Sequence, residues 1–328
     1  MKPITFIAIL ACLTISNIAT AQLGHFSSKT TFFKNNGHEV NQLDSADFIR
    51  VVSAPDSGSK LYNVNEYYPD KSKRTIAKSW NPDNMQFEGQ ATWFFPDGKK
   101  KEMCNYHEAR KKGDDYLYYP NGKIYLHKKY LSDDEKIAGN DVLFLDYRDS
   151  TGTGTNLATD GNGIVKVYDD KFTYVFEEGQ VKNGLRDGDW KGENGDKDTH
   201  MSFSETYDNG TLKTGKAFYS KENKTYTYTV REAMPQFFGG IAAFSAYLGQ
   251  NIKYPGVSRF NKTQGRVIVA FVVERDGKLS DFKVLRYPDM LMAKEAVRVL
   301  SESPNWVPGY QFGKAVRVSY TVPINFTL

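Results

Sequence analysis

The chain has 328 residues, of which 40% are hydrophobic and 25% are charged, and this balance excludes a wholly disordered protein. The formal net charge of +4 is too small to indicate nucleic-acid binding by the whole chain. Because a single core seldom grows beyond roughly 250 residues, the length predicts more than one domain.

The first segment has the pattern of an export signal. A basic residue precedes an apolar run from Ile4 to Ile15, and Ala19-Thr20-Ala21 follows as an A-x-A site. We therefore predict a signal peptide over residues 1–21, cleavage before Gln22, and a protein of the periplasm or cell envelope. One alternative is a retained inner-membrane anchor, although a spanning helix needs about 20 apolar residues. The other is a lipoprotein site at Cys12.

After an N-terminal segment at 22–59, internal similarity extends from about residue 60 to residue 230. Pro-Asp-Gly and Pro-Asn-Gly favour tight turns, and the flanking aromatic residues favour strands. Each copy is therefore predicted to be a β-hairpin that buries its apolar face by stacking on its neighbours. The clearest copies are Tyr67-Tyr68-Pro69-Asp70, Phe94-Phe95-Pro96-Asp97-Gly98 and Tyr118-Tyr119-Pro120-Asn121-Gly122.

These units resemble MORN-type repeats, and residues 179–190 match that pattern best. Two functions are open for the array. It is either a rigid spacer or a binding surface, and the aromatics Tyr67, Phe94 and Tyr118 are accordingly either the core between hairpins or an exposed binding face.

A separate C-terminal domain is predicted from residue 234 to residue 328. A helix follows Gly239-Gly240, with Ile241, Phe244, Leu248 and Ile252 on one buried stripe. Two strands joined at Asp276-Gly277 come next; the first, at residues 267–273, is apolar on both faces and is expected to be central in its sheet.

The second half of this domain begins with a helix from Leu291 to about Glu302, capped by Asp289. A final strand follows, with alternate apolar residues from Val318 to Phe326. The predicted fold class is thus α+β: a β-hairpin repeat array followed by a small domain with two helices packed on a three-stranded antiparallel sheet.

Pro323 interrupts the final strand, and because proline has no N–H to donate, it indicates an edge strand. An edge strand has unpaired backbone groups that can accept a strand from a partner. The alternative is that Pro323 only protects this edge from aggregation.

Several motifs of this domain resemble the TonB C-terminal family, in the form attached to exported proteins. They occur in unbroken order between Met234 and Leu328. The motifs are Met234-Pro235-Gln236-Phe237-Phe238-Gly239-Gly240, Asn251-Ile252-Lys253-Tyr254-Pro255, Gln264-Gly265-Arg266-Val267, Phe271-Val272-Val273-Glu274-Arg275-Asp276-Gly277, Trp306-Val307-Pro308-Gly309 and Tyr320-Thr321-Val322-Pro323-Ile324-Asn325-Phe326. Phe238 departs from the pattern, where proline is expected.

The resemblance implies a periplasmic domain that binds a protein or peptide partner, such as a segment of an outer-membrane TonB-dependent receptor, by strand addition. Alternatives are a homodimer formed through the same edge and an anchored TonB-type energy transducer for receptor-driven uptake. The implied contact residues are Val316, Arg317, Val318, Ser319, Tyr320, Thr321, Val322, Pro323 and Ile324, with Tyr254, Gln264 and Arg266 as additional candidates.

The sequence offers little chemistry for catalysis. The histidines are His25, His38, His107, His127 and His200, and none has metal-ligand spacing with cysteines or carboxylates. No nucleophile elbow, zinc-protease or phosphate-binding motif is present. We therefore predict a binding protein without a metal, cofactor or nucleic-acid partner, and an envelope enzyme is the least favoured alternative.

Overall fold

The computed structural model describes residues 28–137, 139–150, 156–194 and 200–328. It divides into two compact units: one contains the residues up to Gly98 together with Tyr106–Arg110, and the other contains Lys99–Asn105 and Lys111–Leu328. The predicted signal peptide lies outside the described residues. In the described ranges, no helix is both long enough and apolar enough to cross a membrane.

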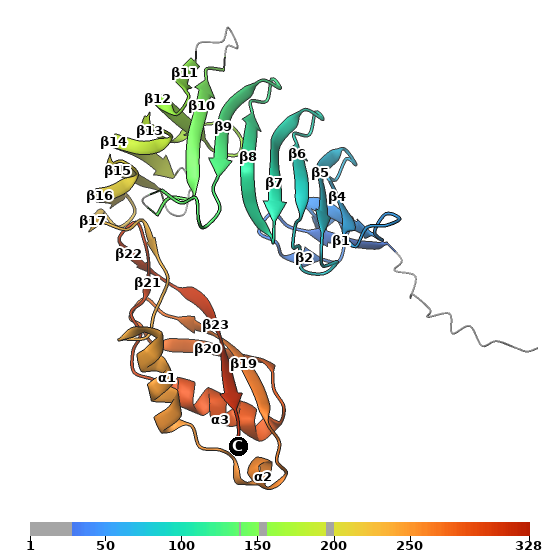
Figure 1. Cartoon of the computed structure of the whole chain (residues 1–328), viewed down its shortest axis with the longest axis vertical. Helices are drawn as coiled ribbons and strands as arrows, with labels where there is room; N and C mark the ends of the chain where they lie inside the picture. Colours follow the sequence, from blue (N-terminus) through green and yellow to red (C-terminus); the bar gives the residue numbers. More distant parts are fainter. Residues whose placement is uncertain (1–27, 138, 151–155, 195–199) are drawn as a thin grey trace, which may run out of the picture. The chain divides into compact units, whose positions relative to one another are not determined.

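The first unit is built from short antiparallel strands (Figure 1). β1 pairs with β2 and β3, and β4, β5 and β6 each pair with the strand before them. The elements are β1 (Lys29–Phe33), β2 (Glu39–Val40), the short 3-10 helix η1 (Leu43–Ser45), β3 (Phe48–Ser53), β4 (Tyr62–Tyr67), β5 (Lys73–Ser79) and β6 (Gly89–Phe94).

The second unit continues with antiparallel hairpins, and from β8 to β17 each strand pairs with the next. The strands that lie wholly or mainly in this unit are β7 (Lys100–His107), β8 (Arg110–Tyr118), β9 (Ile124–Tyr130), β10 (Val142–Arg148), β11 (Asn156–Thr159), β12 (Asn162–Tyr168), β13 (Val175–Lys182), β14 (Leu185–Asn194), β15 (Met201–Asp208), β16 (Thr211–Tyr219) and β17 (Lys224–Tyr228). The predicted hairpin array is confirmed.

The repeated Pro-containing sequences form the turns between strands. The carbonyls of Tyr68, Phe95 and Tyr119 accept hydrogen bonds of 2.9, 2.9 and 2.8 Å from the amides three residues later. Those amides belong to Lys71, Gly98 and Gly122, all of which have left-handed φ angles of 70–88°. Glycine accepts this conformation without strain, and Lys71 holds it without that advantage.

Glycines in the last hairpins lie directly opposite aromatic residues of the neighbouring strand. Their absent side chains leave room for the rings, because a Cβ on Gly179 or Gly215 would come within 2.3 Å of the ring facing it. The sheet can therefore bury large rings without widening. The pairs are Trp190 opposite Gly179, Phe203 opposite Gly192 and Tyr228 opposite Gly215.

Buried ion pairs lie among these rings. Arg231 bonds both Glu177 (2.9 Å) and Glu205, and Arg186 bonds Glu177 at 2.6 Å. The hydroxyl groups of Tyr228 and Tyr207 also donate to Glu205, at 2.8 and 3.1 Å. We call Glu177, Arg186, Glu205 and Arg231 the buried ion network. A related cluster in the first unit joins Glu66 to Arg50 and Arg74.

The C-terminal domain has the predicted layers. α1 and α3 pack on a three-stranded antiparallel sheet in the order β20-β19-β23 (Figure 1). A second small sheet has the order β18-β21-β22. The elements are β18 (Glu232–Ala233), α1 (Gly240–Asn251), α2 (Gly256–Phe260), β19 (Gly265–Val273), β20 (Leu279–Arg286), α3 (Met290–Ser301), β21 (Gly309–Gln311), β22 (Lys314–Val316) and β23 (Val318–Phe326).

The core of this domain follows the predicted patterns, with one exception. Asp289 caps α3 by accepting a hydrogen bond of 2.9 Å from the Met292 amide, as predicted. Alternate residues of β19 and β23 are buried against α1 and α3. Ile241 was expected in the buried stripe of α1, but it is 77% exposed, so that expectation was wrong. It lies in the first turn of α1, and Phe244 is the one buried residue of this helix.

A hairpin formed by β21 and β22 connects the C-terminal domain to the last strands of the array. Its turn residue Phe312 packs on Phe203 and Tyr228, with ring centroids 5.0 and 5.8 Å apart. The Phe312 amide donates to the carbonyl of Arg231 at 2.7 Å, and Lys314 pairs with Glu222. The core of the last hairpins is therefore completed by a residue of the C-terminal domain.

Candidate partner-binding site

The last strand, β23, is the edge of its sheet, as Pro323 predicted. It pairs with β19 in continuous register from Val318 opposite Val273 to Phe326 opposite Gly265. Over residues 200–328, all of which are described, β23 pairs with no other strand. Its second side therefore has backbone groups available to an added strand.

A groove of about 310 Å³ runs beside this edge. One wall is β23 from Tyr320 to Pro323, and the other is formed by the start of α1 and the segment before it. The lining residues are Gln236, Phe237, Gly240, Ile241, Phe244, Trp306, Tyr320, Thr321, Val322 and Pro323. A segment added to β23 would place alternate side chains toward this groove.

Aromatic packing fixes the wall of the groove. Trp306 stands edge-on to Phe244 and Tyr320, with centroids 5.1 and 5.4 Å away. Phe237 packs on Trp306 at 5.8 Å. The Trp306 amide donates at 2.8 Å to the carbonyl of Gly277, where an added Cβ would come within 2.0 Å of the Trp306 carbonyl oxygen. Gly277 is thus required for this close approach.

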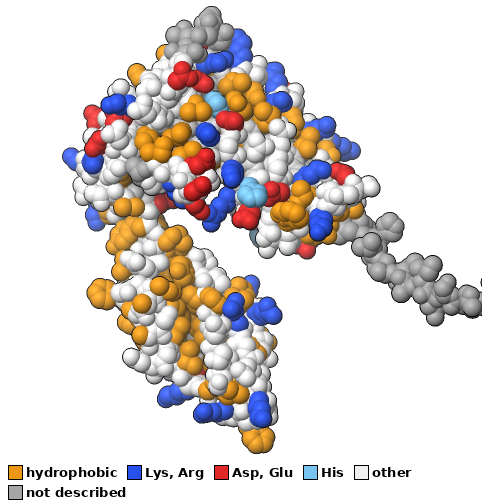
Figure 2. Space-filling view, in the orientation of Figure 1, with side chains coloured by type: hydrophobic (Ala, Val, Ile, Leu, Met, Phe, Trp, Pro, Cys, Tyr) orange, Lys and Arg blue, Asp and Glu red, His pale blue; other side chains and the backbone are white. Residues whose placement is uncertain are grey.

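Ile241 in the groove wall, and two residues of the segment before α1, expose apolar side chains. Phe238 and Ile241 are each 77% exposed, and Met234 is also exposed. Large apolar side chains gathered on one face are typical of an interaction surface. Hydrophobic side chains cover much of the visible face of this domain (Figure 2).

The sequence-predicted contact residues fall into separate places. Ser319 to Ile324 lie in β23, after Val318 begins the strand. Val316 ends β22, where it pairs with Gly309. Arg317 lies between the two strands and pairs with Glu274 at 2.7 Å and Asp281 at 3.0 Å. The hydrogen bonds from Arg317, with one from Ser280, lower the pKa of the Glu274 carboxyl group.

Tyr254, Gln264 and Arg266 lie at the opposite end of β23. The Tyr254 ring stands edge-on to Phe326 at 5.8 Å, and Arg266 donates to the Asn325 side chain at 3.0 Å. The Gln264 side chain accepts from the Leu328 amide at 3.2 Å. These residues order the end of the strand and do not line the groove.

Six groove residues were not among the sequence-predicted contacts: Gln236, Phe237, Gly240, Ile241, Phe244 and Trp306. Phe237 and Trp306 belong to the motifs that carried the family resemblance, but their spacing along the chain does not reveal a common wall. The exposure of Ile241 could not be predicted from the sequence, because its spacing from Phe244 and Leu248 is that of a buried helical stripe.

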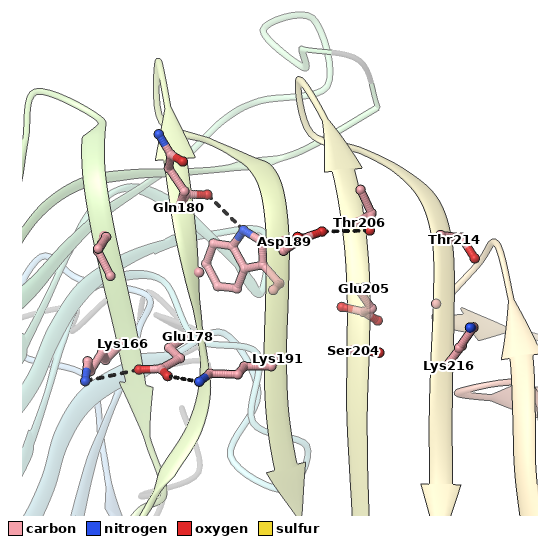
Figure 3. A pocket seen from close by; sticks show the side chains of 14 residues that line it. Lys166, Glu178, Gln180, Asp189, Lys191, Ser204, Glu205, Thr206, Thr214 and Lys216 are labelled. Carbon is pink, nitrogen blue, oxygen red and sulfur yellow. Dashed lines mark hydrogen bonds and ion pairs between the residues drawn. The ribbon is translucent and has the colours of Figure 1, made fainter.

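A second groove, of about 800 Å³, lies on the open face of β12 to β16 (Figure 3). Its lining combines Ile164 and Trp190 with charged and polar side chains, and several of the charged groups are paired. Glu178 bonds Lys166 at 3.1 Å and Lys191 at 3.0 Å, while Thr206 donates to Asp189 at 2.9 Å. These pairs form a cross-strand ladder and leave no arrangement suited to acid–base catalysis among the residues that line this groove.

One group of side chains has metal-binding atom types. Ligand atoms of Glu102, Cys104 and Asp115 lie within 4.8 Å of one another. However, Lys111 and Lys128 each place an ammonium group 3.3 Å from Asp115. Burial alone would lower the pKa of Lys111, but Glu102 and Asp115 outweigh it and raise that pKa. The site therefore already holds cations, and a metal ion would have to displace them.

Comparison with known proteins agrees with the motifs of the C-terminal domain. No curated protein matches the chain. The motif at Met234–Gly240 lies before the matched range, and the MORN resemblance of the array stays a prediction. Residues 250–328 match the model of the family described as Gram-negative bacterial TonB protein C-terminal, which confirms the resemblance found in the sequence.

Proposed function

We propose that this is an exported envelope protein whose C-terminal domain binds an extended segment of a partner protein as an added strand beside β23. The observation that carries the proposal is the groove along the unpaired edge from Tyr320 to Pro323. Backbone hydrogen bonds to an edge strand supply affinity, and the groove supplies selectivity for alternate side chains.

The contact set that we propose joins the edge residues Ser319 to Ile324 with Phe237, Ile241 and Trp306. The exposed apolar side chains of Phe238 and Ile241 support this assignment, because a partner would remove these side chains from water. Tyr254, Gln264 and Arg266 would meet only a segment long enough to reach the far end of the strand.

The family match favours an outer-membrane receptor as the partner class. A photo-crosslinking residue such as benzoylphenylalanine, placed at Thr321 on the edge, should form adducts with envelope proteins in intact cells. The matched control places it at Thr214, an exposed threonine of the array. Mass spectrometry of the adducts would identify the partner, and an adduct of twice the chain mass would indicate homodimer formation instead.

A second variant keeps this test decisive. Ile241→Asp puts a charge in the groove wall and should abolish the Thr321 adducts, while Ile164→Asp, at an exposed isoleucine of the array, should leave them intact. Adducts that persist in Ile241→Asp, or that form equally from Thr214, would contradict strand addition at β23.

The intact mass of the protein distinguishes an exported chain with a cleaved signal peptide from a chain anchored by its N-terminus. The intact mass of the protein from fractionated cells should match a chain that begins at Gln22. A full-length mass in the inner-membrane fraction would favour the anchored energy transducer, and receptor-driven uptake should then fall in Ile241→Asp.

A further inference from the structure

The end of the C-terminal domain that carries α2 has an unusual surface. α2 exposes Val257 by 61% and Phe260 by 87%, although it is only five residues long. Four more large apolar side chains are exposed in β20, the corner after it and the start of α3: Leu285, Tyr287, Met290 and Leu291. The proposed partner groove uses none of these residues.

The corner and the segments around α2 lie together. Pro255 and Leu291 line one shallow pocket, and Gly265 and Pro288 line another. A Cβ added to Gly265 would come within 2.8 Å of Pro288, so the two segments are in close contact. The exposed apolar residues thus belong to one end of the domain, at which α2 is seen in Figure 1.

Basic side chains surround this end, and all of them are exposed: Lys253, Arg259, Lys262, Arg266, Arg286 and Lys294. From residue 250 to residue 273 the sequence has no acidic residue. Two carboxylates in neighbouring segments are occupied, because Asp289 caps α3 and Glu295 pairs with Arg298 at 2.7 Å. Basic and hydrophobic side chains gather at this end in Figure 2.

We propose that this surface, which we call the α2 tip, binds anionic phospholipid headgroups at a membrane surface. Phe260 and Val257 would enter the boundary between headgroups and acyl chains, and the basic side chains would meet the phosphate groups. Charge complementarity selects this occupant. Lysine and arginine stems also suit it, because they cover apolar surface while their charged ends stay in water.

Vesicle flotation with the full chain tests the proposal. The protein should float with vesicles of phosphatidylcholine and phosphatidylglycerol, and much less with phosphatidylcholine alone. Added salt should weaken binding because it screens the headgroup charge. Equal flotation with both vesicle types would overturn the proposal.

Paired variants locate the surface. Arg259→Gln with Lys262→Gln should weaken binding to anionic vesicles by about fivefold for each residue changed. Phe260→Ser with Val257→Ser should also reduce it by about tenfold or more. The controls are Lys182→Gln with Lys216→Gln on the array and Ile241→Ser in the partner groove, and each should float as the unchanged chain does.

Binding to a soluble acidic polymer tests whether the α2 tip recognises an acidic protein instead of a lipid surface. If the chain binds poly-glutamate through Arg259 and Lys262 but does not float with anionic vesicles, the α2 tip is a protein-binding surface and the lipid proposal is wrong. Because Ile241→Asp tests the partner groove alone, failure of the lipid proposal is distinguishable from failure of the proposed function.

Discussion

The last hairpins of the array and the C-terminal domain bury their interiors in different ways. The C-terminal domain closes its sheet with helices, and its core cluster is entirely apolar. Among the described residues of the array, no helix covers β13 to β17, and the interior combines aromatic rings with the buried ion network. Arginine suits this role because its planar group stacks on rings while it bonds carboxylates.

The two interiors should therefore lose stability through different kinds of mutation. An apolar core loses stability roughly in proportion to the volume removed. A buried ion pair adds little over an apolar replacement, but removing one partner leaves an uncompensated charge. Replacing one residue of the buried ion network should thus destabilise the array and leave the stability of the C-terminal domain unchanged. Replacing a core hydrophobic residue distinguishes the two regions less clearly, because both contain apolar core.

The largest expected effect comes from Glu205→Ala. It leaves Arg231 with only Glu177 and removes the acceptor of two tyrosine hydroxyl groups. Removing one partner of a buried ion pair lowers the free energy of unfolding by about 3–5 kcal/mol. Hydrogen exchange read by mass spectrometry should show β14 to β16 losing protection, while β19 keeps its own. The control Glu193→Ala, on the exposed face of β14, should change stability by less than about 0.5 kcal/mol. Similar losses in both variants would show that the network is not the cause.

A smaller effect is expected from Gly215→Ala. The new Cβ would lie 2.3 Å from the Tyr228 ring, so the hairpin must shift. Overpacking of this kind costs about 1–3 kcal/mol, measurable by urea denaturation. Gly249→Ala on α1 is the matched control: no atom lies within 4 Å, and the change should stabilise the helix by about 0.5–1 kcal/mol. A neutral Gly215→Ala variant would mean that the ring has room to move.

Lowering the pH should produce the smallest difference in stability between the array and the C-terminal domain. Burial alone would raise the pKa of Glu177, but Arg186 and Arg231 outweigh burial and lower it. A folded-state pKa below the unfolded value of about 4.3 contributes stability above that pH, and the contribution is lost as pH falls through the folded pKa. Strands β13 and β14 should thus lose exchange protection on acidification before β19 does. Glu177→Gln should reduce this dependence, and earlier loss at β19 would contradict it.

Elements with a strong local pattern were predictable from the sequence. The alternation of β23, the capping of α3 by Asp289 and the edge position signalled by Pro323 each depend on residues a few positions apart. The hairpin of β21 and β22 was missed, because its strands have three residues each and follow two prolines that indicate only an irregular segment.

Long-range pairings were not predictable. Glu177 and Arg231 are 54 residues apart, and nothing in either neighbourhood identifies the other as its partner. The same holds for the groove, whose walls come from segments around residues 236–244, 306 and 320–323. Such sites depend on register and on turns far along the chain, so local periodicity carries no signal for them.

Phe312 has a consequence for the order in which the protein is made. When the chain emerges from its N-terminus, β13 to β17 appear before residue 312 does. The site that the Phe312 ring later fills is therefore exposed to water at first. Their last core contact closes over a separation of 109 residues from Phe203, a slow kind of contact to form. The last hairpins of the array thus reach their final packing only after the hairpin of β21 and β22 has formed.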